Sequence, residues 1–309
     1  MCTHPYAETA EDEVLVLLAD IDAPDRLGHA LAGIGLGPLT GQLLPGASPA
    51  GLRLTMLYFA LFCLHEDWVA RWSSEGPARD LADLTAVYER ALAVFDGSPP
   101  VSTDLPLIRL TTHLARELHS FRLPEHTERF RSALSEYLHS HLWEADIQLH
   151  RHTPPLAEYR QMRPAVLGVR PLFELLPVVH ARPVPAHLLR HPVVRALRDV
   201  LVDFHVLVND LLSLSKELHA ERHPLNTVLV LRAEKSLTLQ QGVDVTARAA
   251  AEELDAYQRL RASLPRLGLE HPPLTAHLAD LERLAADTIA WHAAASRYQT
   301  PAPIGRTDA

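Results

Sequence analysis

The chain has 309 residues, of which 47% are hydrophobic and 22% charged, and its formal net charge at pH 7 is −9. This length allows a large buried core, and the negative charge argues against a nucleic-acid partner. The chain has two cysteines, no basic segment ahead of an apolar run at the N-terminus, and no apolar run long enough to cross a bilayer. We therefore expect a cytoplasmic protein that is not bound to a membrane.

Apolar residues recur at three- and four-residue spacing in almost every segment, while alternating β-branched runs are scarce, so the sequence predicts an all-α fold. In chain order, helices are expected at residues 11–22, 50–74, 80–95, 105–120, 126–150, 154–163, 166–180, 192–221, 224–233, 238–263 and 274–298. The breaks between them coincide with prolines. None of these breaks is long, which predicts one helical domain over residues 1–309 with a flexible tail at about 300–309.

The helix expected at 192–221 carries a row of polar side chains on a face that should be buried. At 100° per residue, Asn209, Ser213, Lys216 and Glu217 fall within a narrow arc. An amide oxygen, a hydroxyl and a carboxylate are hard donors that suit Mg²⁺ or Mn²⁺. Because Mg²⁺ generally shares phosphate oxygens, the row predicts a phosphorylated ligand, with Lys216 as a positive charge beside it.

The alternative interpretation of this row is a solvent-exposed helix face without a binding function, on which Lys216 forms an ion pair at the surface. Lysine is rare in the chain, however, since only Lys216 and Lys235 occur among 29 basic residues. A lysine inside the row is therefore harder to explain as a generic positive charge.

Two segments decide between these interpretations by their resemblance to a known family. The stretch "NDLLSLSKE", residues 209–217, resembles the metal motif N/D-D-x-x-S/T-x-x-x-E of bacterial class I terpene synthases (terpene cyclases), which commonly has Lys before the Glu. The segment "HPLNTVLVL", residues 223–231, is similar to the one that follows this motif in the family.

Two further matches lie on either side of that motif. The stretch "PPLAEYRQMRPAVLGVRPLFELL" resembles the family's Y-x-x-x-R segment, and its Arg163 stands 46 residues before Asn209, the separation expected of the diphosphate-sensing arginine. The ending "WHAAASRY" resembles the family's W-x-x-x-x-S-R-Y, with Arg297 and Tyr298 at the diphosphate-binding positions.

The resemblance implies a class I terpenoid synthase helical bundle with a central active-site cavity. It implies Mg²⁺-dependent ionisation of a prenyl diphosphate, followed by carbocation cyclisation and release of diphosphate. Three Mg²⁺ ions are expected, with Mn²⁺ as an alternative, and Asn209, Ser213 and Glu217 among their ligands. The expected diphosphate-binding residues are Arg163, Lys216, Arg297 and Tyr298.

The family's second metal motif, D-D-x-x-D/E, is incomplete in this chain. Its place is taken by "HEDWVAR", which has Glu66 and Asp67 but no third acid. The resemblance implies that Asp67 bridges metal ions and that Glu66 assists, in a register that is ambiguous by one residue. If the motif no longer binds metal, the protein is instead a catalytically degenerate relative that binds an isoprenoid or a partner protein. A chain-elongating prenyltransferase is disfavoured because that family uses two aspartate-rich motifs.

The helix break after Arg163 also departs from the family, which often has a small polar residue and then glycine three and four positions after this arginine. Here Val166 and Leu167 stand there, Gly168 follows one residue later, and Pro164 adjoins Arg163. Proline and glycine still permit a kink at this point.

A carbocation needs a dry pocket, and aromatic faces can stabilise it. The aromatic residues expected in the pocket wall are Phe59, Phe62, Phe173 and Trp291, and each could equally be ordinary core packing. His205, one turn before Asn209, is a candidate base or a core residue. The substrate stays open between farnesyl, geranylgeranyl and copalyl-type diphosphates, giving a sesquiterpene or a diterpene, and the protein between a monomer and a homodimer.

Overall fold

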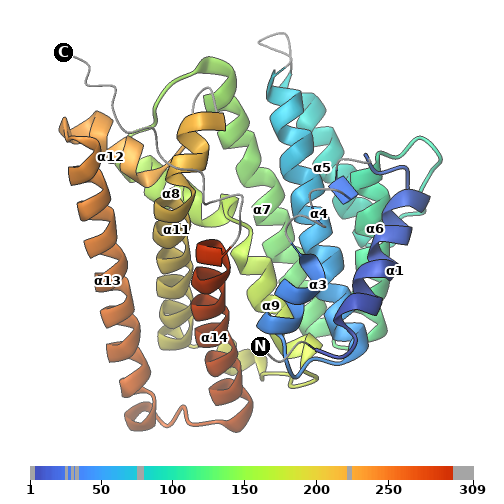
Figure 1. Cartoon of the computed structure of the whole chain (residues 1–309). Helices are drawn as coiled ribbons and strands as arrows, with labels where there is room; N and C mark the ends of the chain where they lie inside the picture. Colours follow the sequence, from blue (N-terminus) through green and yellow to red (C-terminus); the bar gives the residue numbers. More distant parts are fainter. Residues whose placement is uncertain are drawn as a thin grey trace.

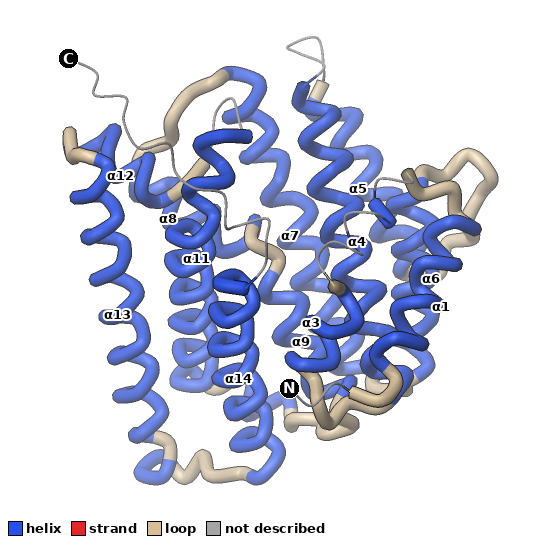
Figure 2. Tube along the Cα trace, in the orientation of Figure 1, coloured by secondary structure: helices blue, strands red, loops and turns tan. Residues whose placement is uncertain are grey.

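The computed structural model describes residues 4–24, 27–28, 31, 35–74, 80–220 and 225–294. Within these ranges all the regular secondary structure is helical, as Figure 2 shows, and this confirms the all-α prediction. The tail expected at about 300–309 lies outside the described residues. Among the described helices, none combines the length and the hydropathy of a membrane span.

The helices follow the predicted order closely. They are α1 (Ala7–Asp20), α3 (Leu36–Leu43), α4 (Pro49–Ser74), α5 (Leu81–Phe95), α6 (Pro106–Ser120), α7 (Pro124–His150), α8 (Leu156–Val166), α9 (Val169–Val179), α10 (Ala186–Leu189), α11 (Pro192–Ala220), α12 (Thr227–Lys235), α13 (Leu239–Ser263) and α14 (Pro272–Ala294). Several begin at a proline, because the first helical position needs no backbone N–H donor.

Helix α3 was not predicted, since its sequence "LGPLTGQL" contains two glycines and a proline that weaken helix propensity. Packing stabilises it instead. Leu36, Leu39 and Leu43 are buried, and the absence of a side chain at Gly41 lets the N-terminal segment approach. A Cβ at Gly41 would lie 3.2 Å from the Cβ of Ala7.

The helices enclose a central space. In Figure 1, α1, α4, α5 and α6 lie on one side of α7, and α8, α11, α13 and α14 lie on the other. Helix α3 packs on α4 and α14, α14 packs on α9 and α11, and α9 packs on α4 and α11. These contacts close a ring of five helices, α3, α4, α9, α11 and α14.

Candidate active site

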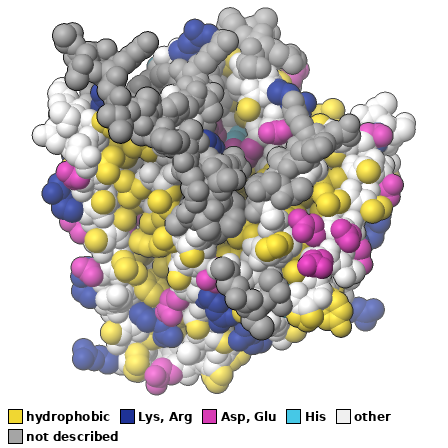
Figure 3. Space-filling model, in the orientation of Figure 1, with side chains coloured by type: hydrophobic (Ala, Val, Ile, Leu, Met, Phe, Trp, Pro, Cys, Tyr) yellow, Lys and Arg dark blue, Asp and Glu magenta, His cyan; other side chains and the backbone are white. Residues whose placement is uncertain are grey.

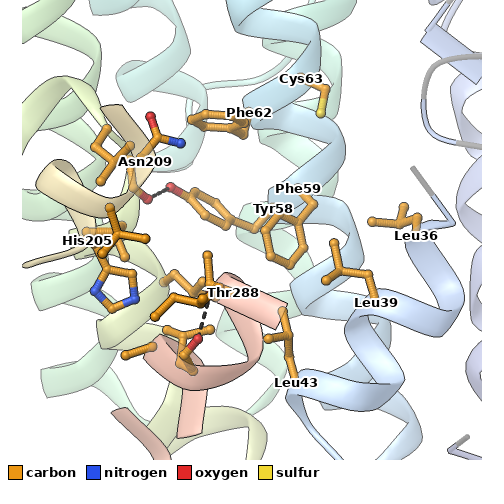
Figure 4. Close-up of a pocket in the computed structure, with 18 of the residues that line it drawn as sticks. Leu36, Leu39, Leu43, Tyr58, Phe59, Phe62, Cys63, His205, Asn209 and Thr288 are labelled. Carbon is orange, nitrogen blue, oxygen red and sulfur yellow. Dashed lines mark hydrogen bonds between the residues drawn. The ribbon is translucent and has the colours of Figure 1, made fainter. Parts of the chain in front are cut away.

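An apolar cavity of about 180 Å³ lies inside the ring of five helices. Figure 4 labels wall residues Leu36, Leu39 and Leu43 of α3, Tyr58, Phe59, Phe62 and Cys63 of α4, His205 and Asn209 of α11, and Thr288 of α14. The structure thus places the predicted residues Phe59, Phe62 and His205 in the wall. Asn209 stands beside them as a polar group at the edge of an apolar surface.

The expectation that Phe173 lines this cavity is wrong. Helix α9 turns Val169 and Leu172 toward the cavity, and Phe173 is 100° further round the helix. Its ring meets His205 edge-on, with centroids 5.7 Å apart, and it borders a second, polar cavity that Arg129 also lines. Phe173 is therefore a core residue behind the wall.

Three of the predicted site residues near the C-terminus lie partly or wholly outside the described part of the structure. The backbone of Trp291 belongs to α14, but its side chain is not among the described ones, and Arg297 and Tyr298 lie beyond the described residues. Thr288 and Ile289, earlier on the same helix, line the cavity. Helix α14 thus contributes to the wall, and the roles expected of Trp291, Arg297 and Tyr298 stay predictions.

The polar row on α11 faces the interior of the bundle. Ser213 is 2% exposed and Glu217 is 7% exposed, and Lys216 is partly buried. The Ser213 hydroxyl donates to the backbone carbonyl of Asn209 over 2.7 Å. A solvated helix face would leave these side chains open to water, so that alternative does not describe this structure.

Asp210 joins three helices beneath this row. Its fully buried carboxylate accepts from the Tyr159 hydroxyl (2.7 Å), the Thr227 backbone N–H (2.8 Å) and the Arg163 guanidinium (Nη2, 2.8 Å). The same Nη2 of Arg163 donates to Oδ1 of Asn209 over 3.1 Å. Burial alone would lower the pKa of Arg163, but the acidic groups around it, Asp210 first and then Tyr159, Glu217 and Glu144, together outweigh burial, so the pKa lies well above its usual range. Arg163 is therefore held as a cation beside Asn209.

Glu217 is fixed by the start of α12. The side-chain amide of Asn226 donates to Oε2 of Glu217 (2.8 Å) and to the carbonyl of Asp210 (2.6 Å), while its oxygen accepts from the Val228 N–H and caps α12. Burial raises the pKa of Glu217 and the charge of Asp210 adds to this increase, while the charge of Arg163 only partly opposes it. The environment therefore disfavours an ionised Glu217 unless a cation is bound near it.

The incomplete acidic motif on α4 meets a second helix. Oε1 of Glu66 accepts from the Tyr137 hydroxyl over 3.1 Å and lies 3.0 Å from Nε2 of His141. Glu144, one turn further along α7, has its Oε2 3.5 Å from the same nitrogen. Asp67 is partly exposed on the next position of α4. In Figure 3, acidic side chains and a histidine gather in a recess at the upper end of the molecule.

Charges of the acidic motif and of the α11 row both act on Glu144. Burial raises the pKa of Glu144, and the negative charges of Glu66 and Glu217 raise it further, while His141 and Arg163 oppose this. Glu144 is thus close enough to feel carboxylates from both α4 and α11. Hard oxygen donors with excess negative charge are the surroundings that divalent cations such as Mg²⁺ prefer, so the residues present fit a metal site.

Sequence analysis missed four residues of this region. Asp210 was considered only as a letter of the motif. Its signal is that an acidic side chain on a buried helix needs a hydrogen-bond or charge partner, which predicts a structural contact. Asn226 carries a local signal, because Asn before an apolar run predicts a helix cap. His141 and Glu144 carry none, since only the packing of α7 on α4 brings them to Glu66.

The break between α8 and α9 is made by Gly168. Helix α8 includes Pro164 and ends at Val166, and Gly168 adopts a left-handed conformation with φ +73°. The Tyr58 hydroxyl donates to its carbonyl, as Figure 4 shows. A Cβ at this position would lie 2.8 Å from the Phe62 ring. Only glycine can therefore turn the chain here without displacing the cavity wall.

We expect Gly168→Ala to destabilise the fold by more than the roughly 1–2 kcal/mol that a left-handed backbone alone costs a residue with a side chain, because the new methyl group also pushes Phe62 aside. Gly268→Ala is the matched control, since Gly268 has φ +66° and nothing within 4 Å of an added Cβ. Urea unfolding of both variants measures the difference. Equal losses would show that the contact with Phe62 has no cost.

The fold is a helical bundle that holds an apolar cavity beside a cluster of acidic side chains. The family model described as "Terpene synthase family 2, C-terminal metal binding" matches residues 58–256, which is more than half of the chain. The chain belongs to this family and is a terpene synthase with a metal-binding domain.

The relatives agree with this family, and the solved structures share its fold. The chain is 26% identical to the (+)-T-muurolol synthase ((2E,6E)-farnesyl diphosphate cyclizing) of Roseiflexus castenholzii, over 95% of this chain and 90% of that protein. It is 26% identical to the (+)-eremophilene synthase of Sorangium cellulosum, over 96% and 89%. Among solved structures, germacradien-4-ol synthase from Streptomyces citricolor has a TM-score of 0.74 at 22% identity, covering 96% of this chain and 94% of that chain.

Proposed function

We propose that the protein is a Mg²⁺-dependent cyclase that ionises farnesyl diphosphate, cyclises the resulting carbocation and releases diphosphate. The observation that carries the proposal is the row of Asn209, Ser213 and Glu217, in which Ser213 and Glu217 are buried and Asn209 lines an apolar cavity. Relatives of nearly equal length that cyclise farnesyl diphosphate support this substrate over a longer one.

The proposed ligands come from two helices: Asn209, Ser213 and Glu217 of α11, and Glu66 and Asp67 of α4. We expect three Mg²⁺ ions, as the family resemblance implied, with Mn²⁺ as an alternative. When bound, they would supply Lewis-acid stabilisation of the charge that develops on the departing diphosphate.

The protein's own cations complete the diphosphate site. Arg163 can bind diphosphate oxygens through its planar guanidinium, and Asp210 fixes the orientation of that group. Lys216 is a second positive charge on the α11 row, and Arg297 and Tyr298 are proposed as further donors. Together these residues bind the leaving group at one end of the substrate.

The apolar cavity binds the hydrocarbon end of the substrate. Its wall excludes water from the carbocation, which would otherwise be quenched early. The faces of Phe59 and Phe62 can each stabilise a cation by about 0.5–2 kcal/mol. His205 is a candidate for the final proton acceptor, because its Nδ1 lies 2.6 Å from the Leu201 carbonyl and a proton on Nδ1 leaves Nε2 as the basic nitrogen.

The test is incubation of the purified protein and Mg²⁺ with farnesyl, geranylgeranyl and copalyl diphosphates, followed by gas chromatography. We expect a sesquiterpene hydrocarbon or alcohol from farnesyl diphosphate and its loss when EDTA is added. Product from a longer diphosphate alone would correct the substrate. If none of the three gives a product, and the affinity for diphosphate is the same with and without Mg²⁺, the protein is better described as a catalytically degenerate isoprenoid-binding relative.

A further inference from the structure

Glu66, His141 and Glu144 form a compact group of ligand atoms from two helices. Nε2 of His141 lies 3.0 Å from Oε1 of Glu66 and 3.5 Å from Oε2 of Glu144. Two ligands at adjacent positions of an octahedral ion are roughly 3.0 Å apart when each bond is about 2.1 Å long. Each carboxylate oxygen therefore lies from Nε2 at close to the separation of neighbouring ligands on one ion.

His65 also has a ligand atom within 4.8 Å of those of Glu66 and His141, but its nitrogens have other roles. The Tyr137 hydroxyl gives its only hydrogen to Glu66, so it must accept from Nδ1 of His65, 2.9 Å away. Nε2 of His65 then accepts from the Tyr88 hydroxyl, also over 2.9 Å. This chain of hydrogen bonds orients Glu66 and makes His65 a positioning residue.

His141 is oriented as metal-binding histidines usually are. Its Nδ1 lies 2.9 Å from the Tyr137 backbone carbonyl and donates to it, which directs Nε2 at the two carboxylates. The side chain is only 1% exposed. Nε2 shares a proton with Oε1 of Glu66 when no metal is bound, and a cation held between His141, Glu66 and Glu144 would take the place of that proton.

We infer that His141 and Glu144 of α7 are ligands of the cation at the acidic motif, together with Glu66. They take the place of the third carboxylate that "HEDWVAR" lacks. The inference rests on the proposed metal-dependent function. An imidazole ligand favours Mn²⁺ over Mg²⁺ relative to an all-oxygen site, so this protein should discriminate between the two ions more than a site of carboxylates alone would.

The test is pulsed electron paramagnetic resonance of the full chain with Mn²⁺ and inorganic diphosphate. Bound Mn²⁺ in the wild type should show ¹⁴N modulation from a coordinated imidazole. His141→Gln should abolish this modulation and weaken Mn²⁺ binding on the order of tenfold or more, as loss of even a supporting residue around a metal does. Glu144→Gln should weaken binding and keep the modulation.

His139→Gln is the matched control, because His139 is on the same helix and pairs with the exposed Glu89. It should leave the spectrum and the affinity unchanged, and circular dichroism should show that every variant is folded. No ¹⁴N modulation in the wild type, or modulation that persists in His141→Gln and so comes from another histidine such as His65, would overturn the inference. Neither result changes the outcome expected in the substrate assay. Conversely, if the wild type shows the modulation but turns over none of the diphosphate substrates, only the proposed function is refuted.

Discussion

Asp210→Asn is expected to reduce both stability and activity. The substitution leaves Arg163 buried without its counter-charge, and breaking a buried ion pair from one side costs about 3–5 kcal/mol. The new amide also presents a donor group where Tyr159, Thr227 and Arg163 all require an acceptor. Urea unfolding at neutral pH measures the stability, and turnover of farnesyl diphosphate measures the activity.

The matched control is Asp199→Asn on the same helix. Asp199 accepts from Arg170 over 2.7 Å, but its side chain is 48% exposed, so the loss should be below about 1 kcal/mol. Similar losses for the two variants would show that Asp210 is not the anchor of α8, α11 and α12. A stable Asp210→Asn protein with full activity would also remove the reason for placing Arg163 beside the diphosphate.

The α11 row shows what local geometry allows a sequence to predict. The relative direction of Asn209, Ser213 and Glu217 depends only on the helical repeat, so three letters at four-residue spacing place three side chains on one face. Which face is buried follows from the apolar residues on the rest of the helix. The structure places this row inside the bundle, and its role in binding metal stays a prediction.

The α4 side of the site depends on contacts that no spacing encodes. Glu66 and His141 are 75 residues apart, and they meet because α7 packs on α4, with Phe62 stacked on Tyr137 at 5.8 Å. The family pattern directs attention to acids within "HEDWVAR" and so misses donors from another helix. Helix α3 was not predicted from the sequence for a related reason, since tertiary packing rather than local propensity stabilises it.

Glu217→Gln is expected to separate activity from stability. Glutamine has the same shape and still accepts from Asn226 through its amide oxygen, but it cannot supply an anionic ligand. Losing a metal contact that supplies several kcal/mol of charge stabilisation should lower turnover by about 10²-fold or more. Excess Mg²⁺ should restore part of the rate, because the remaining ligands of the row are intact.

The stability of Glu217→Gln should stay the same or rise. Burial and then Asp210 raise the pKa of Glu217 in the folded state, so folding without metal disfavours the carboxylate that is ionised at neutral pH. A neutral amide removes that penalty, which is the pattern of a residue retained for function at a cost in stability. Gas chromatography and urea unfolding, each with Asp199→Asn alongside, measure the two effects. Unchanged turnover in a folded Glu217→Gln protein would mean that the α11 row does not bind the metal ions, and the proposed mechanism would fail with it.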